Sequence, residues 1–298
     1  MRILLTGATG YIAGNLLPAL IEKGCEVICC VRDISRFERV KQKYPGVVVV
    51  EADFLKPDTL KNIPDNIDAA YYLIHSMSSL KGDFTKMEEQ SAINFRERFQ
   101  NTGLRQVVYL SGIVNAGNLS RHLSSRLNVE RILAEGTYAL TTLRAGIIIG
   151  AGSASFQIIR DLVEKLPVMI APRWLNTPSQ PIAIKDVVRF LSGVLFNEKT
   201  FNNSYDIGGP DILTYQQMLQ ICAKVMGLRR WIRTVPVMTP KLSSYWLYFI
   251  TSASYPLARN LVDSMKVEII CRENDLAGML NINPVSFEQA VREAITGG

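Results

Sequence analysis

The sequence predicts an α/β protein with a doubly wound parallel sheet and a smaller C-terminal α/β lobe. Three observations lead to this prediction. Short apolar runs alternate with segments of helical periodicity, a glycine-rich turn follows the first run, and several runs are apolar throughout, as strands covered on both faces require. The chain of 298 residues is long enough for one such body with an added lobe.

The expected strands are short runs rich in β-branched and other apolar residues. They cover residues 3–5, 27–31, 47–50, 69–74, 106–110 and 140–143. Between the first two runs, Ile12, Leu16 and Leu20 recur at helical spacing, and Gly24 supplies a helix stop. Right-handed crossovers would stack these strands into one parallel sheet.

The regular alternation ends near residue 150. Prolines at 167, 172, 178 and 181 mark loops, and helices are expected over residues 215–226 and 287–294. Residues 181–184 and 204–207 are expected to return as strands to the main sheet. We therefore divide the chain into a nucleotide-binding half, residues 1–150, and an interleaved substrate lobe, residues 151–298.

Composition excludes several classes of protein. With 48% hydrophobic and 20% charged residues, the chain has the composition of a folded globular protein. Five cysteines form no CxxC pair, which suits buried thiols in a reducing cytoplasm, and two histidines are too few for a zinc motif, so no metal is expected. The net charge of +6 is scattered along the chain, so we predict no nucleic-acid partner.

No membrane-spanning segment is expected. The N-terminal apolar run is too short for a signal peptide, and the longest uncharged stretch, residues 242–258, contains Pro256 and falls short of the ~20 apolar residues that a spanning helix needs. A helix of the core or lobe is the main interpretation of this stretch. The alternative is a membrane-surface or protein docking patch made by Tyr245, Trp246, Tyr248 and Phe249.

The glycine-rich turn TGATGYIAG, residues 6–14, predicts a dinucleotide site. Gly7 permits the tight bend from strand to helix, Gly10 lets the backbone approach a pyrophosphate, and the start of the helix offers free N–H groups. Thr9, Tyr11 and Ile12 complete the expected contacts. The turn lacks a GK[ST] ending, which disfavours a P-loop nucleotidase.

The end of the second strand indicates which coenzyme is bound. Arg32 in CCVRD occupies the expected tip, where an arginine pairs with a 2′-phosphate, so NADP(H) is favoured over NAD(H). Asp33 follows immediately and keeps NAD(H) open. Asp53 and Phe54 follow the third strand, where they would meet the adenine, although a turn or capping role for Asp53 is also open.

Further motifs carry a family resemblance. They read YYLIHSM at 71–77, VVYLSG at 107–112, HLSSR at 122–126, LRAGIIIGAGSASF at 143–156 and QPIAIKDV at 180–187. With the glycine turn, they carry a resemblance that extends over most of the chain. The sequence resembles the atypical, extended-like short-chain dehydrogenase/reductases, a group of NAD(P)-binding, epimerase/dehydratase-like proteins related to NmrA.

The resemblance implies site residues. His75 and Ser76 should lie beside the ribose or nicotinamide, and Ser111 should border the reaction centre. Active relatives carry Tyr and Lys four positions apart, whereas the matching positions here are His122 and Arg126. His122 would then act as general acid and Arg126 would bind the ribose; the alternative is an ordinary helix residue and a positioning charge.

Four residues are expected to contact the substrate. The small residues of GIIIGAGSAS would leave space beside the nicotinamide, and related proteins line their substrate pocket with the corresponding loop. The candidates are Arg144, Ser153, Arg173 and Trp174.

Two classes of function remain open on sequence alone. The first is an NADP(H)-dependent oxidoreductase acting on a small carbonyl, enone or quinone, with a sugar-nucleotide epimerase or dehydratase as a further enzymatic alternative. The second is a non-catalytic redox sensor or accessory subunit, which the missing Tyr/Lys pair favours.

Overall fold

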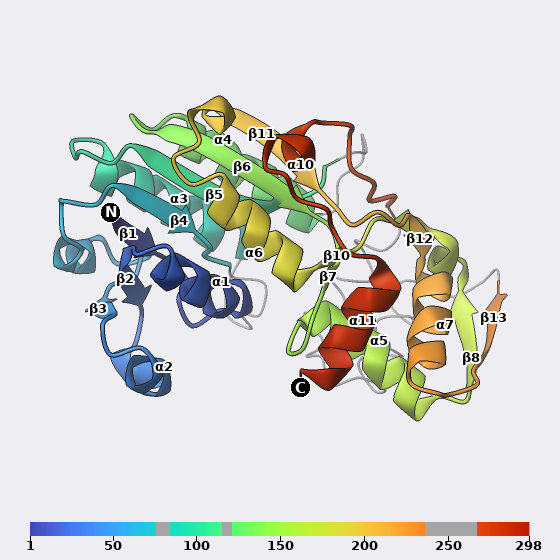
Figure 1. Ribbon diagram of the computed structural model, residues 1–298. Coiled ribbons are helices and arrows are strands. Elements are labelled where there is room, and N and C mark those ends of the chain that lie inside the picture. The colour runs from blue at the N-terminus through green and yellow to red at the C-terminus, as the bar shows by residue number, and fades with distance from the viewer. Residues whose placement is uncertain (76–83, 115–120, 236–266, 298) are drawn as a thin grey trace.

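A seven-stranded parallel sheet forms the centre of the computed structural model, which describes residues 1–75, 84–114, 121–235 and 267–297 (Figure 1). The strand order is β11-β6-β5-β4-β1-β2-β3. The strands are β1 (Arg2–Leu5), β2 (Glu26–Val31), β3 (Val48–Glu51), β4 (Ala69–Tyr72), β5 (Gln106–Gly112), β6 (Ala139–Ala145) and β11 (Asn203–Ile207). The doubly wound α/β fold expected from the sequence is confirmed.

Helices cover both faces of this sheet. On one face lie α1 (Tyr11–Glu22) and α6 (Ile184–Gly193), and on the other lie α3 (Phe84–Phe99) and α4 (Arg121–Ala134). Successive strand side chains point to opposite faces, so Ile3 and Leu5 pack with α1 and α6, whereas Leu4 packs with α3 and α4. Both faces of β1 are therefore buried.

The C-terminal half contributes one strand to the main sheet. β11 pairs in parallel with β6, as expected for residues 204–207. The expectation for residues 181–184 is wrong: β10 (Ile182–Ala183) pairs with β7 (Ile148–Ile149) in a separate two-stranded sheet. Because α6 begins at Ile184, only Ile182 and Ala183 remain for strand pairing.

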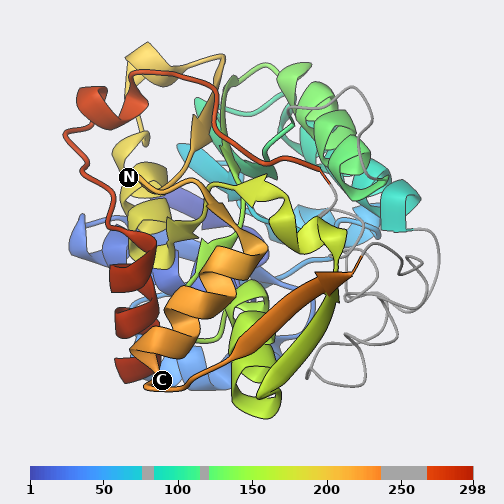
Figure 2. The same cartoon turned by 90° about the vertical axis from the view of Figure 1, so that its right-hand side faces the viewer.

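The rest of the chain forms a lobe with its own apolar core. Figure 2 shows this lobe from its end, with α7 and α11 side by side. Its elements are α5 (Ala154–Lys165), β8 (Val168–Pro172), η3 (Arg173–Asn176), β9 (Pro178–Ser179), β12 (Leu213–Thr214), α7 (Tyr215–Val225), β13 (Trp231–Val235), α10 (Leu276–Met279) and α11 (Phe287–Thr296). The core contains Phe156, Met218 and Phe287. The remaining short helices are η1 (Ile34–Phe37), α2 (Glu38–Lys43), η2 (Pro57–Asn62) and η4 (Glu198–Thr200).

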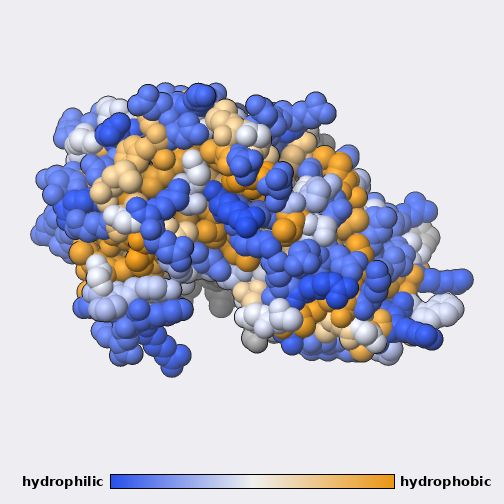
Figure 3. Space-filling model, in the orientation of Figure 1, coloured by the Kyte–Doolittle hydropathy of each residue, from blue (hydrophilic) through white to orange (hydrophobic). Residues whose placement is uncertain are grey.

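The surface mixes residue types. On the face in Figure 3, hydrophilic and apolar side chains are interspersed. Among the described residues, no helix has the length and apolar character needed to cross a membrane. The proposed docking patch around Tyr245 lies outside the described residues.

Candidate functional site

The glycine turn joins β1 to α1 in a conformation that its glycines require. Gly7 has φ +61°, and a Cβ there would lie 2.5 Å from the Leu73 carbonyl oxygen. The Gly10 N–H donates to Gly7 O at 2.8 Å, and Gly10 itself is extended immediately before α1. The first N–H groups of α1 therefore face a hollow at the carboxyl ends of the strands.

This hollow, the glycine-turn cavity, has a volume of about 180 Å³. Residues from the ends of four neighbouring strands line it. They include seven of the expected coenzyme contacts, namely Gly7, Thr9, Gly10, Arg32, Asp53, Phe54 and His75. Ser76 lies outside the described residues.

Arg32 and Asp33 have different surroundings. Asp33 Oδ1 accepts hydrogen bonds from Ser35 N at 3.0 Å and from Ser35 Oγ at 2.6 Å, which caps η1 and lowers the pKa of Asp33. Arg32 is exposed, lines the glycine-turn cavity, and has no hydrogen bond or ion pair within the described ranges. The arginine is therefore the side chain available at the strand tip.

Asp53 has the turn role that the sequence left open, and its contact with the adenine stays a prediction. Its Oδ1 accepts from Leu55 N at 3.0 Å, and its backbone N–H donates to Thr59 Oγ1 at 2.9 Å, so Asp53 organises the turn after β3. It also lines the glycine-turn cavity beside Phe54.

A second hollow, the apolar cavity, has a volume of about 310 Å³. His75 lines both cavities, so they adjoin at this residue. Besides His75, five of the predicted residues contribute here, namely Tyr11, Ile12, Ser111, Arg126 and Ser153. Most of the remaining lining is aliphatic, including Leu110, Ile113, Leu123, Ile147, Ile148, Ile159 and Ile269.

Three buried polar atoms in this lining lack hydrogen-bond partners within the part of the chain that the structure describes. They are Tyr11 Oη, Ser111 Oγ and Arg126 Nε. Burial raises the pKa of Tyr11 to about 12, so its hydroxyl keeps its proton at neutral pH. Since buried polar groups in folded proteins are usually paired, these three atoms are candidate donors to a molecule bound in the apolar cavity.

A buried carboxylate lies behind the cavities. The Glu88 side chain on α3 is 3% exposed; its Oε1 lies 2.8 Å from His75 Nδ1, and its Oε2 accepts from Ser125 Oγ at 2.5 Å. Arg126, on the same helix as Ser125, donates from Nη1 to Leu110 O at 2.9 Å. We name His75, Glu88, Ser125 and Arg126 the Glu88 cluster.

The charge states within the Glu88 cluster follow from these contacts. Burial acts to raise the pKa of Glu88, but the His75 hydrogen bond and the Arg126 charge outweigh it and lower that pKa to about 2. Burial and the Arg126 charge lower the pKa of His75. At neutral pH the carboxylate is therefore ionised and the imidazole neutral, which makes Nδ1–H the donor to Glu88.

The backbone places His122 on α4, one turn before Arg126, and its side chain lies outside what the structure describes. Of the three expected catalytic residues, Ser111 and Arg126 therefore meet at the apolar cavity. The role of His122 stays a prediction.

The four residues expected to contact the substrate lie in different places. Ser153 lines the apolar cavity and donates to Ile148 O at 2.6 Å. Arg144 and the exposed Arg173 line neither cavity, and Arg144 is bound by Glu130. Contact of either residue with a substrate stays a prediction. Trp174 belongs to η3, and its side chain is not among those described.

Glu88 and Ser125 were missed from the sequence. A signal for Glu88 was present, because residues 88, 92, 95 and 99 follow the spacing of one helix face and Ala92, Phe95 and Phe99 are buried. A carboxylate in such a stripe needs a partner.

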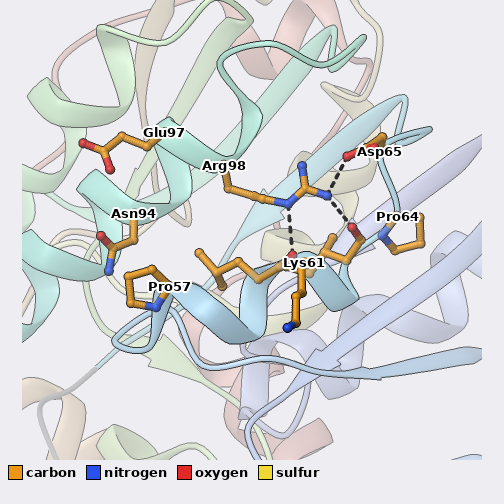
Figure 4. A pocket seen from close by; sticks show the side chains of 9 residues that line it. Pro57, Lys61, Pro64, Asp65, Asn94, Glu97 and Arg98 are labelled. Carbon is orange, nitrogen blue, oxygen red and sulfur yellow. Dashed lines mark hydrogen bonds and ion pairs between the residues drawn. The ribbon is translucent and has the colours of Figure 1, made fainter.

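A third hollow of about 490 Å³ lies over η2 and α3 and shares no lining residue with the two cavities. Figure 4 shows Arg98 reaching across it: Nε donates to Leu60 O at 3.0 Å, and Nη2 donates to Ile63 O and to Asp65 at 2.7 Å. These contacts fasten the chain after η2 to α3, so this hollow is separate from the candidate site.

The glycine turn at the amino end of α1, open to a cavity at the strand ends, defines a Rossmann-type dinucleotide-binding protein. A match to the NAD(P)H-binding family covers residues 7–148. Residues 7–148 therefore form an NAD(P)H-binding domain, whose coenzyme is a nicotinamide dinucleotide.

Known proteins resemble the chain at low identity. The photosystem II assembly factor Ycf39 of Synechocystis sp. is 23% identical over 240 residues, which cover 80% of this chain and 71% of that protein. Triphenylmethane reductase of Citrobacter sp., solved with NADP(H), has a TM-score of 0.78 at 17% identity and covers 99% of this chain and 100% of its own. An NADPH-dependent quinone oxidoreductase of Escherichia coli, solved with NADPH, has a TM-score of 0.76 at 16% identity. The match covers 97% of this chain and 98% of that protein. The two structural likenesses show the fold alone.

Proposed function

We propose that this protein is an NADP(H)-dependent oxidoreductase that reduces a small apolar carbonyl, enone or quinone. The observation that carries the proposal is the apolar cavity adjoining the glycine-turn cavity at His75. Its aliphatic lining favours an apolar molecule, and the donors Tyr11, Ser111 and Arg126 favour an oxygen on that molecule.

The preference for NADP(H) rests on the tip of β2. Arg32 is an unpaired cation within the described residues and lines the glycine-turn cavity, while the carboxylate of Asp33 is engaged by Ser35. A 2′-phosphate offers Arg32 a bidentate partner, whereas a ribose diol would need a free carboxylate.

The chain's own residues supply orientation and a proton. The bound nicotinamide supplies the hydride. Arg126 and Ser111 would donate hydrogen bonds to the substrate oxygen and stabilise the negative charge that develops on it when the substrate accepts the hydride. Ser111 or His122 would then deliver the proton to that oxygen, so that hydride plus proton complete a two-electron reduction.

A non-catalytic role is the second candidate. It is supported by His122 and Arg126 in place of the Tyr/Lys pair, and by the similarity to a protein named as a photosystem II assembly factor. In this role the chain would bind a dinucleotide as a redox sensor or accessory subunit, with Tyr245, Trp246, Tyr248 and Phe249 as the membrane-surface or protein docking patch.

Sugar-nucleotide epimerase or dehydratase chemistry has less support. Sugar hydroxyls need many polar partners, whereas most of the apolar-cavity lining is aliphatic. Arg173 and Trp174 stay predictions for substrate contact. A cytoplasmic location is part of the proposal, because Cys25, Cys29, Cys30 and Cys222 are buried free thiols.

Coenzyme binding and turnover test the proposal together. NADPH and NADH are titrated into wild type and Arg32→Ser, with oxidation of bound NADPH followed against a panel of quinones, enones and aldehydes. We expect wild type to bind NADPH more tightly than NADH. Arg32→Ser should weaken NADPH binding about tenfold, or ~1.4 kcal/mol, and should change NADH binding little. Arg36→Ser, which changes a cation outside the glycine-turn cavity, is the matched control.

The outcomes separate the candidates. Turnover that His122→Ala abolishes assigns the proton to His122, and turnover that survives it favours Ser111. Tight NADPH binding without turnover on any member of the panel supports the non-catalytic role. Equal affinity of wild type and Arg32→Ser for NADPH would contradict the assigned coenzyme preference.

A further inference from the structure

A buried carboxylate behind the cavities is the strongest feature that the proposed reaction leaves unused. Glu88 occupies the buried face of α3, in line with Ala92, Phe95 and Phe99. Removing a carboxylate from water costs several kcal/mol unless partners compensate. An apolar side chain would fill this position without that cost, so the carboxylate calls for an explanation.

The two carboxylate oxygens of Glu88 contact side chains from two different parts of the fold. Oε1 contacts His75, which follows β4, and Oε2 accepts from Ser125 on α4. Neither Glu88 nor Ser125 lines either cavity, whereas His75 lines both and Arg126 lines the apolar one. Glu88 therefore acts on the cavities through its neighbours.

The surrounding charges fit this arrangement. His75 and Arg126 face Glu88 from the end of β4 and from α4, and Tyr72 on β4 and Tyr109 on β5 also lie within electrostatic range. The Arg126 guanidinium carbon lies 6.0 Å from the Tyr109 ring centroid. Arg126 is the cation among these groups, and it balances the Glu88 charge.

We propose that Glu88 is a positioning residue, which sets the tautomer of His75 and, through Ser125, the placement of Arg126 at the junction of the two cavities. With Nδ1–H donating to the carboxylate, the neutral ring carries no proton on Nε2, so Nε2 is a hydrogen-bond acceptor. The same helix turn that Ser125 ties to Glu88 carries Arg126. This inference rests on the proposed function for its consequence, since the aligned groups are those that would meet the coenzyme and the substrate.

The tautomer is measured directly. The chain has two histidines, so His122→Gln leaves a single imidazole whose ring nitrogens can be observed by ¹⁵N NMR without coenzyme or turnover. We expect the Nδ1–H tautomer in this background, and a shift toward Nε2–H when Glu88→Leu or Glu88→Gln is added. An Nε2–H ring in the Glu88 background would overturn the inference.

Coenzyme affinity gives the second readout. We expect Glu88→Gln to weaken NADPH binding about tenfold and Ser125→Ala about threefold, with the His75 tautomer unchanged in Ser125→Ala. Glu130→Gln is the matched control, because Glu130 is a buried carboxylate on α4 that pairs with Arg144 away from both cavities. It should lower stability and leave NADPH affinity unchanged.

The two proposals fail differently. If Glu88 sets the tautomer but NADPH does not bind to wild type, the proposed function fails while the positioning of His75 stands. If NADPH binds and both Glu88→Gln and Ser125→Ala match wild type in affinity, the positioning role is overturned. Should Glu88→Gln fail to fold, Ser125→Ala still decides whether the link to α4 matters.

Discussion

Arg126 on α4 and Arg144, which pairs with a residue of α4, have different surroundings. Arg144 on β6 donates to Glu130 from Nε at 3.1 Å and from Nη2 at 2.6 Å, and its Nη1 lies 3.9 Å from Asp206. Arg126 on α4 donates from Nη1 to a backbone carbonyl and leaves Nε unpartnered among the described residues, beside a cavity. We therefore interpret Arg144 as a structural arginine and predict that Arg126, which has an unpaired donor beside a cavity in the described part of the chain, binds a ligand.

The Arg144 side is a closed network. Glu130 Oε1 also accepts from Ser204 Oγ at 2.7 Å, and Asp206 Oδ2 accepts from Arg272 N at 3.0 Å. These contacts join α4, β6, β11 and the segment before α10. Such a network holds these elements together and directs Arg144 toward Glu130 and Asp206.

Removing Arg144 should have the largest effect on stability. Arg144→Met leaves the buried carboxylates of Glu130 and Asp206 without their cation, so we expect a loss of about 3–5 kcal/mol in the free energy of unfolding. Urea unfolding measures it. NADPH affinity of the folded protein should stay at the wild-type value, and a loss of affinity equal to that of Arg126→Met would break the comparison.

Low pH should destabilise the protein through protonation of Glu88, which lies near Arg126. The folded pKa of Glu88 is about 2, below the unfolded value of 4.5, so its stabilising contribution is present above pH 4.5 and is lost as the pH falls toward 2. The shift corresponds to about 3 kcal/mol. His75 adds a loss that begins as the pH falls below 6.5, because its folded pKa is lowered. Unfolding free energies of wild type and Glu88→Gln against pH measure this, and parallel curves below pH 4.5 would contradict it.

Arg126→Met should mainly affect binding. A charged hydrogen bond to a ligand contributes about 1.5–3 kcal/mol, so we expect coenzyme or substrate affinity to fall by about ten- to a hundredfold. Titration of NADPH and of a quinone measures the loss. Its stability change should be smaller than that of Arg144→Met, because His75 and Ser125 still bond Glu88 when Arg126 is removed, and the reverse order would contradict this expectation.

Arg98 gives the smallest expected effect. Like Arg144 it binds acceptors of the protein, but Asp65 is exposed and the other two acceptors are backbone carbonyls, so we expect Arg98→Met to lower stability by about 1 kcal/mol. Thermal unfolding measures it. NADPH affinity should not change, because the hollow in Figure 4 shares no residue with the candidate site.

Local patterns predicted the strands and the glycine turn. Gly7, Gly10 and the first helix act within a few residues of one another, so their arrangement is encoded in one short segment. The Glu88 cluster was beyond such patterns, because Glu88 and Ser125 are separated by 37 positions and meet only when α3 packs against α4.

Arg144 shows why the partner of a strand-end residue could not be predicted. Successive strand side chains leave on opposite faces. Leu143 and Ala145 belong to the core that contains α1 and α6, so Arg144 points to the other face, where α4 supplies Glu130. The sequence predicts that Arg144 lies near the end of its strand, but it does not predict which acidic residue pairs with it.

The edge strand β11 has a practical consequence for dissecting the protein. It comes from residues 203–207 and covers the outer edge of β6. A fragment ending at residue 150 would keep the whole glycine turn yet expose the unpaired backbone groups of β6, which invite edge-to-edge aggregation. Expression trials aimed at the nucleotide-binding half should therefore extend beyond Ile207.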